Sequence, residues 1–143
     1  MFAHTQSRPP GVPCLKGPRV SLGPWQAGDR APFAALNADA ETMRWFPSVL
    51  DRAQSDALAD TIESMLARQG WGFWAARQED GEFIGFVGLN VPRFDAPFMP
   101  AVEIGWRLAR SHWNRGYATE AATLALDHAF GALELAEVVA FTT

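Results

Sequence analysis

The feature that most constrains the fold is a helical segment between two apolar strands near the C-terminal end of the sequence. Residues 101–110, AVEIGWRLAR, alternate in the way of a strand, and AEVVAFTT at residues 136–143 is a second apolar strand. The helix expected between them has a polar or small stripe opposite an apolar one. The first stripe consists of Gly116, Glu120, Thr123, Asp127 and Gly131, and the second of Ala121, Leu124, Ala125 and Phe130. A helix that joins two strands of one sheet predicts a right-handed parallel crossover.

The upstream sequence predicts antiparallel strands and two helices. GFWAAR and EFIGFVGLNV form a hairpin whose tight turn spans residues 78–81, where Asp80-Gly81 supplies the required positive φ. A short strand begins at Val20, a helix capped by Asp29 ends near Asn37, and a longer helix covers residues 51–69. On the strand at residues 101–110 we expect one face to carry Val102, Ile104, Trp106 and Leu108. The fold class is therefore α/β (α+β), a mixed antiparallel and parallel sheet flanked by helices.

Length and composition predict a single domain and exclude several partners. The 143 residues divide into a proline-rich arm, 1–18, expected to be disordered, and a domain at 19–143. A formal charge of −4 with a single lysine argues against nucleic acid, and no apolar run approaches the length of a membrane span. The one cysteine, Cys14, is expected to be a free surface thiol, which favours a cytoplasmic location. The histidines lack the spacing of metal ligands, so we expect no metal.

The turn before the last helix has the composition of an anion site. The first N–H groups of a helix have no intrahelical acceptor, and the helix dipole adds positive potential there. Gly116 and Ala118 leave the backbone accessible, and Arg115 can add a full charge. The three-glycine dinucleotide motif and the GK[ST] of a nucleotide triphosphate loop are both absent. Close packing of helix on strand remains an alternative reason for the small residues.

The residues from Val20 onward resemble the GNAT superfamily of acyl-CoA-dependent N-acyltransferases. The family motif Q/R-x-x-G-x-G/A matches residues 113–118, WNRGYA, with Trp113 in the Gln/Arg position. The extended form W-x-x-G-Y-A-T-E-A, matched by residues 113–121, resembles the branch of ribosomal-protein N-terminal (alanine/serine) acetyltransferases. RVSLGPW, MRWFP, FIGFVGL and EIGWRL extend the resemblance over nearly all of the chain after residue 18.

This resemblance implies acetyl-CoA as co-substrate and assigns residues to it. The pantetheine would bind main-chain groups of Trp106 and Leu108, in a splay between their strand and the last one. The coenzyme A pyrophosphate would bind the backbone of the motif loop and the residue after it: Trp113, Asn114, Arg115, Gly116, Tyr117, Ala118 and Thr119.

The implied reaction is direct attack of a primary amine, either a protein N-terminus or a small-molecule amine, on the thioester. Such a step needs a proton acceptor, for which Glu103 acting through water is the candidate; an ion pair with Arg107 is its structural alternative. Trp45 and Phe46 are candidates for the acceptor pocket, with core packing as the alternative. His112 is expected to be a surface residue.

The family usually continues past the strand at residues 136–143 with a loop, a helix and a hairpin. We therefore expect a domain that is incomplete at its C-terminal end, with weak coenzyme A binding and poor turnover. Three explanations stay open: a truncated gene product, a fragment, or half of an assembly in which a second copy or a partner chain covers the open strand edge. Two other functions stay open: a non-catalytic acyl-CoA-binding or interaction module, and a general phosphate-binding α/β domain.

Overall fold

The computed structural model describes residues 12–44, 46–91, 102–135 and 138–140. Two strands are followed by helices, then by three strands, and a last helix leads to the final strand. The elements are β1 Leu15–Lys16, β2 Val20–Gly23, the short 3-10 helix η2 Ala27–Asp29, α1 Arg30–Ala38, α2 Arg52–Gln69, β3 Phe73–Gln78, β4 Phe83–Asn90, β5 Glu103–Leu108, η3 Arg110–His112, α3 Tyr117–Phe130 and β6 Val139–Ala140.

The six strands form one mixed sheet in the order β1-β2-β3-β4-β5-β6. Neighbours from β1 to β5 are antiparallel, whereas β5 and β6 are parallel. The chain leaves β5, runs through α3 and returns as β6, so the parallel crossover and the fold class expected from the sequence are confirmed.

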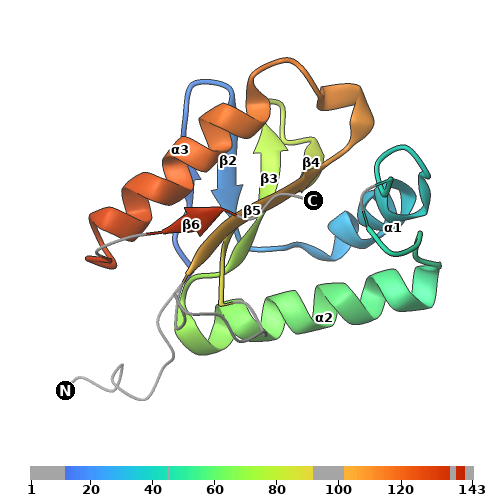
Figure 1. Ribbon diagram of the computed structural model, residues 1–143, viewed down its shortest axis with the longest axis horizontal. Helices are drawn as coiled ribbons and strands as arrows, with labels where there is room; N and C mark the ends of the chain where they lie inside the picture. Colours follow the sequence, from blue (N-terminus) through green and yellow to red (C-terminus); the bar gives the residue numbers. More distant parts are fainter. Residues whose placement is uncertain (1–11, 45, 92–101, 136–137, 141–143) are drawn as a thin grey trace.

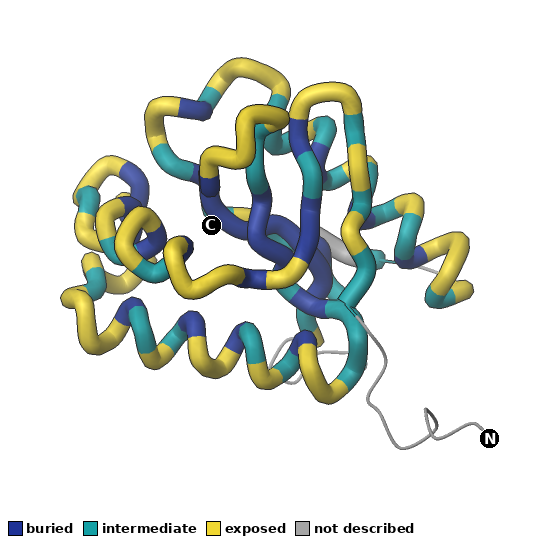
Figure 2. Tube along the Cα trace, turned by 180° about the vertical axis from the view of Figure 1, so that it is seen from behind, coloured by how far each residue is buried: buried dark blue, intermediate teal, exposed yellow. Residues whose placement is uncertain are grey.

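Helices cover both faces of the sheet (Figure 1). One face carries Trp74, whose indole packs edge-on against His128 of α3 with 5.5 Å between ring centroids. The other face carries Phe86, which packs against Phe33 of α1, and α2 lies on this same side (Figure 1). Because side chains alternate along a strand, one sheet separates two apolar layers. Figure 2 shows the result, with buried residues concentrated in the central strands and exposed ones on the outer helix faces.

Local chemistry explains where the longest helix and the hairpin turn begin and end. Asp51 caps α2 by accepting the Gln54 N–H at 2.8 Å, and Gln54 reciprocates with its own side chain at 2.9 Å. Gly70 ends the helix in the left-handed conformation. Gly81, at φ 93°, supplies the positive φ expected between β3 and β4.

Two expectations about the N-terminal third are wrong. Residues 12–18 were expected to be disordered, yet β1 pairs antiparallel with β2, so the ordered part begins earlier. Residues 1–11 lie outside the described part of the chain. Asp29 does not cap α1, because its buried carboxylate accepts Arg77 at 2.5 Å and the Gln26 N–H at 2.7 Å. A carboxylate that holds a guanidinium from β3 ties the chain before α1 to the sheet.

The apolar stripes of β5 and α3 also differ from expectation in one residue each. On β5, Ile104 and Leu108 are buried, but Trp106 is 48% exposed. On α3, Phe130 is 49% exposed, and Ala129 is buried in its place. Alanines at Ala121, Ala125 and Ala129 form the buried stripe, so α3 lies close to the sheet.

Candidate functional site

The turn between β5 and α3 presents free backbone N–H groups. Asn114 and Gly116 both have positive φ, at 60° and 80°, and α3 starts immediately afterwards. No side chain caps the helix, and the Glu120 N–H, which donates to the Gly116 carbonyl at 3.0 Å, makes the first helical bond. The N–H groups of residues 117–119 therefore precede the first N–H that donates within the helix, and they have no acceptor inside it. Together with the helix dipole they form a positive end suited to an anion.

Gly116 is required here for a reason other than the open ligand approach expected from the sequence. At φ 80° a side chain is strained, and a Cβ at this position would lie 3.0 Å from Arg19 Nη2. Glycine thus allows the left-handed turn and the close approach of Arg19. The left-handed turn and the approach of Arg19 together set the direction of the free N–H groups at the start of α3.

A cavity of about 370 Å³ lies against this turn. Its walls are the end of β5, the turn and the first residues of α3: Trp106, Leu108, His112, Trp113, Asn114, Gly116, Ala118 and Thr119. Arg115 and Tyr117, the other two residues predicted for the loop, do not line it. The Arg115 carbonyl instead accepts Arg19 Nη1 at 2.8 Å, and the Tyr117 hydroxyl donates to Gln78 at 3.0 Å.

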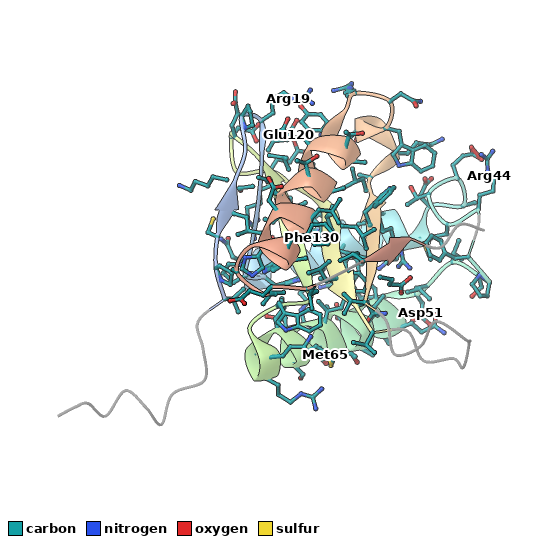
Figure 3. The ribbon with its side chains drawn as sticks, turned by 60° about the vertical axis from the view of Figure 1, so that its left-hand side comes forward. Arg19, Arg44, Asp51, Met65, Glu120 and Phe130 are labelled. Atoms are coloured by element: carbon teal, nitrogen blue, oxygen red, sulfur yellow. The ribbon has the colours of Figure 1, made fainter. Side chains whose placement is uncertain are left out.

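Arg19, which directly precedes β2, and Glu120 of α3 brace the turn, and no local pattern in the sequence predicts this contact. The Glu120 carboxylate accepts the Arg19 N–H at 2.7 Å, the Val20 N–H at 3.0 Å and Arg19 Nε at 2.9 Å. The Arg19 guanidinium lies 4.6 Å from the centroid of the Tyr117 ring. Burial opposes ionisation of Glu120, but these hydrogen bonds outweigh it and lower its pKa. Figure 3 shows the two labelled side chains together beside the first turn of α3.

His112 was expected at the surface, but it is 6% exposed. Its ring packs against Tyr117, with centroids 5.5 Å apart, and Nδ1 lies 2.9 Å from Ser111 Oγ. The 3-10 turn η3 folds this histidine back under the loop, which residue type alone does not predict. It thereby becomes part of the wall of the small cavity.

A second cavity, of about 870 Å³, lies beside β5 on the side of α2. Trp106, Leu108 and Trp113 line both cavities. The Trp113 indole N–H donates to the Leu108 carbonyl at 2.9 Å and so fixes the wall between them. A turn suited to an anion and a larger, mostly apolar chamber thus meet at the end of β5.

Glu103, the predicted proton acceptor, lies in the wall of the larger cavity. Its carboxylate accepts Asn90 Nδ2 at 3.1 Å, and among the described residues no ion pair joins it to Arg107. Arg107 donates to Asn37 Oδ1 at 2.8 Å instead. Two residues four positions apart on one strand are too distant for the direct pairing that the sequence left open, since a strand rises about 3.3 Å per residue.

Phe46, predicted for the acceptor pocket, lines the larger cavity and is 38% exposed. Trp45, predicted with it, lies outside the described residues. On its outer edge β5 pairs with β6 only at Glu103 and Ile104 in the described part of the chain. The edge beyond, from Gly105 to Leu108, therefore has no described strand partner.

Two negative findings hold for the residues that the structure describes. No group of three or more His, Cys, Asp or Glu side chains is arranged to bind a metal ion. None of the described helices has both the length and the apolar character needed to cross a membrane. Cys14 is exposed and free, as predicted.

Residues 19–143 match the sequence model of the acetyltransferase (GNAT) domain. The chain belongs to the GNAT acetyltransferase family. It is 30% identical to the protein YkkB of Bacillus subtilis over 124 residues, which cover 85% of this chain and 71% of that protein. It is 38% identical to the FsC-acetyl coenzyme A-N(2)-transacetylase of Aspergillus fumigatus over 139 residues, 91% of this chain and 58% of that one. The crystal structure of an acetyltransferase from Agrobacterium tumefaciens superposes with a TM-score of 0.76 at 28% identity, covering 93% of this chain and 75% of that one.

The described residues fit the acetyl-CoA that GNAT acetyltransferases use. The small cavity combines free N–H groups at a helix start with the small side chain of Ala118, which suits a pyrophosphate. In the described part of the chain the edge of β5 at Trp106 and Leu108 has no strand partner, so it offers main-chain groups to an amide-bearing chain such as pantetheine. Both features belong to the backbone.

Proposed function

We propose that this GNAT protein transfers an acetyl group from acetyl-CoA to a primary amine. The observation that carries the proposal is the meeting of the two cavities at Trp106, Leu108 and Trp113. One cavity suits the phosphates of the donor, and the other holds a carboxylate beside a chamber large enough for an acceptor. Family membership supplies the reaction class.

Each part of the site has a separate role in the proposed reaction. When bound, acetyl-CoA supplies the acetyl group as a thioester. The N–H groups of residues 117–119 hold its pyrophosphate, and the edge of β5 that has no described strand partner orients the chain that leads toward Glu103. Glu103 accepts, through water, the proton that the ammonium of the acceptor loses before attack. Asn90 orients the carboxylate by its hydrogen bond at 3.1 Å.

Two kinds of acceptor remain within the proposal. The W-x-x-G-Y-A-T-E-A resemblance favours a protein N-terminus, as in the ribosomal-protein branch. The Aspergillus relative is described by its name as an N(2)-transacetylase, which favours a small-molecule amine. The larger cavity, at about 870 Å³, is of the size that small ligands occupy.

Release of free coenzyme A thiol from acetyl-CoA, measured with and without amines, tests the proposal. The panel contains short peptides with free N-termini and simple primary amines, and product mass confirms N-acetylation. We expect thiol release that depends on the amine and yields an N-acetyl product. Tight coenzyme A binding without amine-dependent release would indicate a non-catalytic acyl-CoA-binding module instead. Equal calorimetric affinity for nucleotides and coenzyme A would indicate a general phosphate-binding domain.

The role of Glu103 is tested by Glu103→Gln, which keeps the acceptor for Asn90 but removes the base. We expect kcat to fall by about 100-fold, the lower range for general base catalysis, and the rate to lose its dependence on a deprotonated carboxylate. Glu79→Gln, at an exposed position in the β3–β4 turn, is the matched control. An unchanged pH–rate profile in Glu103→Gln would remove Glu103 from the mechanism.

A further inference from the structure

Arg107 lies in the wall of the larger cavity with its charge unpaired by any described carboxylate. It projects from β5 toward α1, where Nη1 donates to the buried Asn37 at 2.8 Å. Its guanidinium lies 4.2 Å from the ring centroid of Phe46 and 5.3 Å from that of Phe86. Buried Nε has no hydrogen-bond partner. Arg30 and Arg77, the other two described arginines that are partly buried, both pair with Asp or Glu, so Arg107 differs from them.

Burial of a charged guanidinium costs free energy unless hydrogen bonds or an opposite charge compensate for the lost hydration. Desolvation lowers the pKa of Arg107 to about 10, so the side chain is still a cation at neutral pH. Stacking on aromatic rings and one amide acceptor satisfy only part of a group that has five N–H donors. A purely apolar side chain would fill the same space without this penalty. Because Nε is buried, the N–H groups left for a ligand in the cavity are those of the two terminal nitrogens that do not bond Asn37.

The coenzyme A phosphates are not that ligand. The small cavity against the Gly116 turn does not include Arg107 among its lining residues. Arg107 faces α1 and α2, the side of the sheet opposite α3. The Arg107 guanidinium therefore lies in the larger cavity, which the proposed function assigns to the amine acceptor.

We propose that the amine acceptor carries a carboxylate and that Arg107 binds it. This inference rests on the proposed function, because it names the class of acceptor for the same site. The planar guanidinium fork matches a carboxylate in a bidentate arrangement, and the two flanking rings hold the fork in place.

The geometry of β5 sets the distance between the two ends of such an acceptor. Glu103, Gly105 and Arg107 alternate onto one face of the strand and all line the larger cavity. Glu103 and Arg107 are about 13 Å apart at their Cα atoms, at 3.3 Å per residue. Gly105 lies between them and has no side chain. A Cβ there would lie 3.3 Å from the Phe73 ring, so glycine leaves the cavity wide between Glu103 and Arg107. An acceptor therefore fits with its amine near Glu103 and its carboxylate several bonds away.

Matched acceptors that differ only in charge test the inference in the acetyl-transfer assay. The peptide pair is Ser-Ala-Glu-amide and Ser-Ala-Gln-amide, in which two extended residues and one side chain place the carboxylate more than about 7 Å from the amine. The small-molecule pair is ε-aminocaproic acid and its amide. We expect kcat/KM for the acid of at least one pair to exceed that for its neutral partner by about 10- to 100-fold, mainly through KM. The pair that shows the preference distinguishes an acidic peptide from a small amino acid.

The variant Arg107→Gln distinguishes loss of carboxylate binding from a general loss of activity. Glutamine can still donate to Asn37, and we expect the preference for the acid to disappear while the KM for acetyl-CoA stays within about twofold. Arg107→Lys, which keeps the charge but not the fork, should retain only part of the preference. Arg52→Gln, on the exposed face of α2, is the control and should keep the preference in full.

The outcomes distinguish this inference from the proposed function. Equal use of acids and neutral partners by the wild-type protein overturns the carboxylate assignment and leaves acetyl transfer intact. An acid preference that survives in folded Arg107→Gln also overturns it. If Arg107→Gln fails to fold, Arg107→Lys carries the test, and a full preference in that variant contradicts bidentate binding. No acetyl transfer to any amine would instead refute the proposed function itself.

Discussion

Replacing Gly116 with alanine perturbs the turn that presents the free N–H groups of α3. The residue has φ 80°, a conformation that costs an L-residue about 1–2 kcal/mol. The added Cβ would also lie 3.0 Å from Arg19 Nη2, so the guanidinium that contacts the Arg115 carbonyl and the Tyr117 ring must give by a few tenths of an ångström. We therefore expect Gly116→Ala to lower the free energy of unfolding by about 1–2 kcal/mol.

Urea denaturation and coenzyme A titration measure the two consequences separately. With an m-value of about 2 kcal/mol/M, the midpoint should fall by about 0.5–1 M at unchanged m. Relaxation of the turn re-aims the first N–H groups of α3, so the dissociation constant for coenzyme A should rise by about tenfold or more. Both effects arise from one backbone angle.

Gly28 provides the matched control, because a Cβ there would meet nothing within 4 Å and its φ is not positive. Gly28→Ala should leave coenzyme A binding unchanged and stabilise the protein slightly, by up to about 1 kcal/mol. A Gly116→Ala protein as stable as Gly28→Ala, with unchanged affinity for coenzyme A, would refute the reasoning about the turn.

Two further predictions concern the stability of the elements around the site. Glu120→Ala leaves the N–H groups of Arg19 and Val20 without their acceptor. We expect it to lower the free energy of unfolding, measured by urea denaturation, by about 1–3 kcal/mol. A change below about 0.5 kcal/mol, the effect of an ordinary surface substitution, would contradict this prediction. Because the folded pKa of Glu120 is lowered, its stabilising charge is present above the ordinary value of 4.5 and is lost as pH falls through the folded pKa. Burial beside Trp74 lowers the pKa of His128, so stability should fall as pH drops below the ordinary 6.5, and His128→Gln should remove that part of the pH dependence. An identical slope of stability against pH between 5 and 7 in wild type and His128→Gln would contradict this assignment.

The parts of the fold that the sequence predicts well depend on local chemistry. The α2 helix begins at its Asp51 cap and ends at Gly70, and the β3–β4 turn follows its Asp-Gly pair. The loop from Trp113 to Ala118 could be located in the same way, because a strand, a glycine and a helix follow one another directly. Each of these signals lies within a few residues of the structure that it determines.

The residues that the sequence did not assign depend on contacts between distant segments. Arg19 reaches Glu120 across about a hundred positions, and Arg107 reaches Asn37 across seventy. The burial of His112 depends on how η3 folds under the loop. Residue type and spacing cannot specify such neighbours, because they arise only when the sheet and helices assemble.

A crystal structure with coenzyme A and an amine acceptor tests the central claim most directly, namely that the two cavities are the two ends of one acetyl-transfer site. We expect the pyrophosphate against the N–H groups of residues 117–119, the thiol end at the junction formed by Trp106, Leu108 and Trp113, and the amine beside Glu103. Coenzyme A bound away from the Gly116 turn, or an acceptor bound outside the larger cavity, would contradict the account.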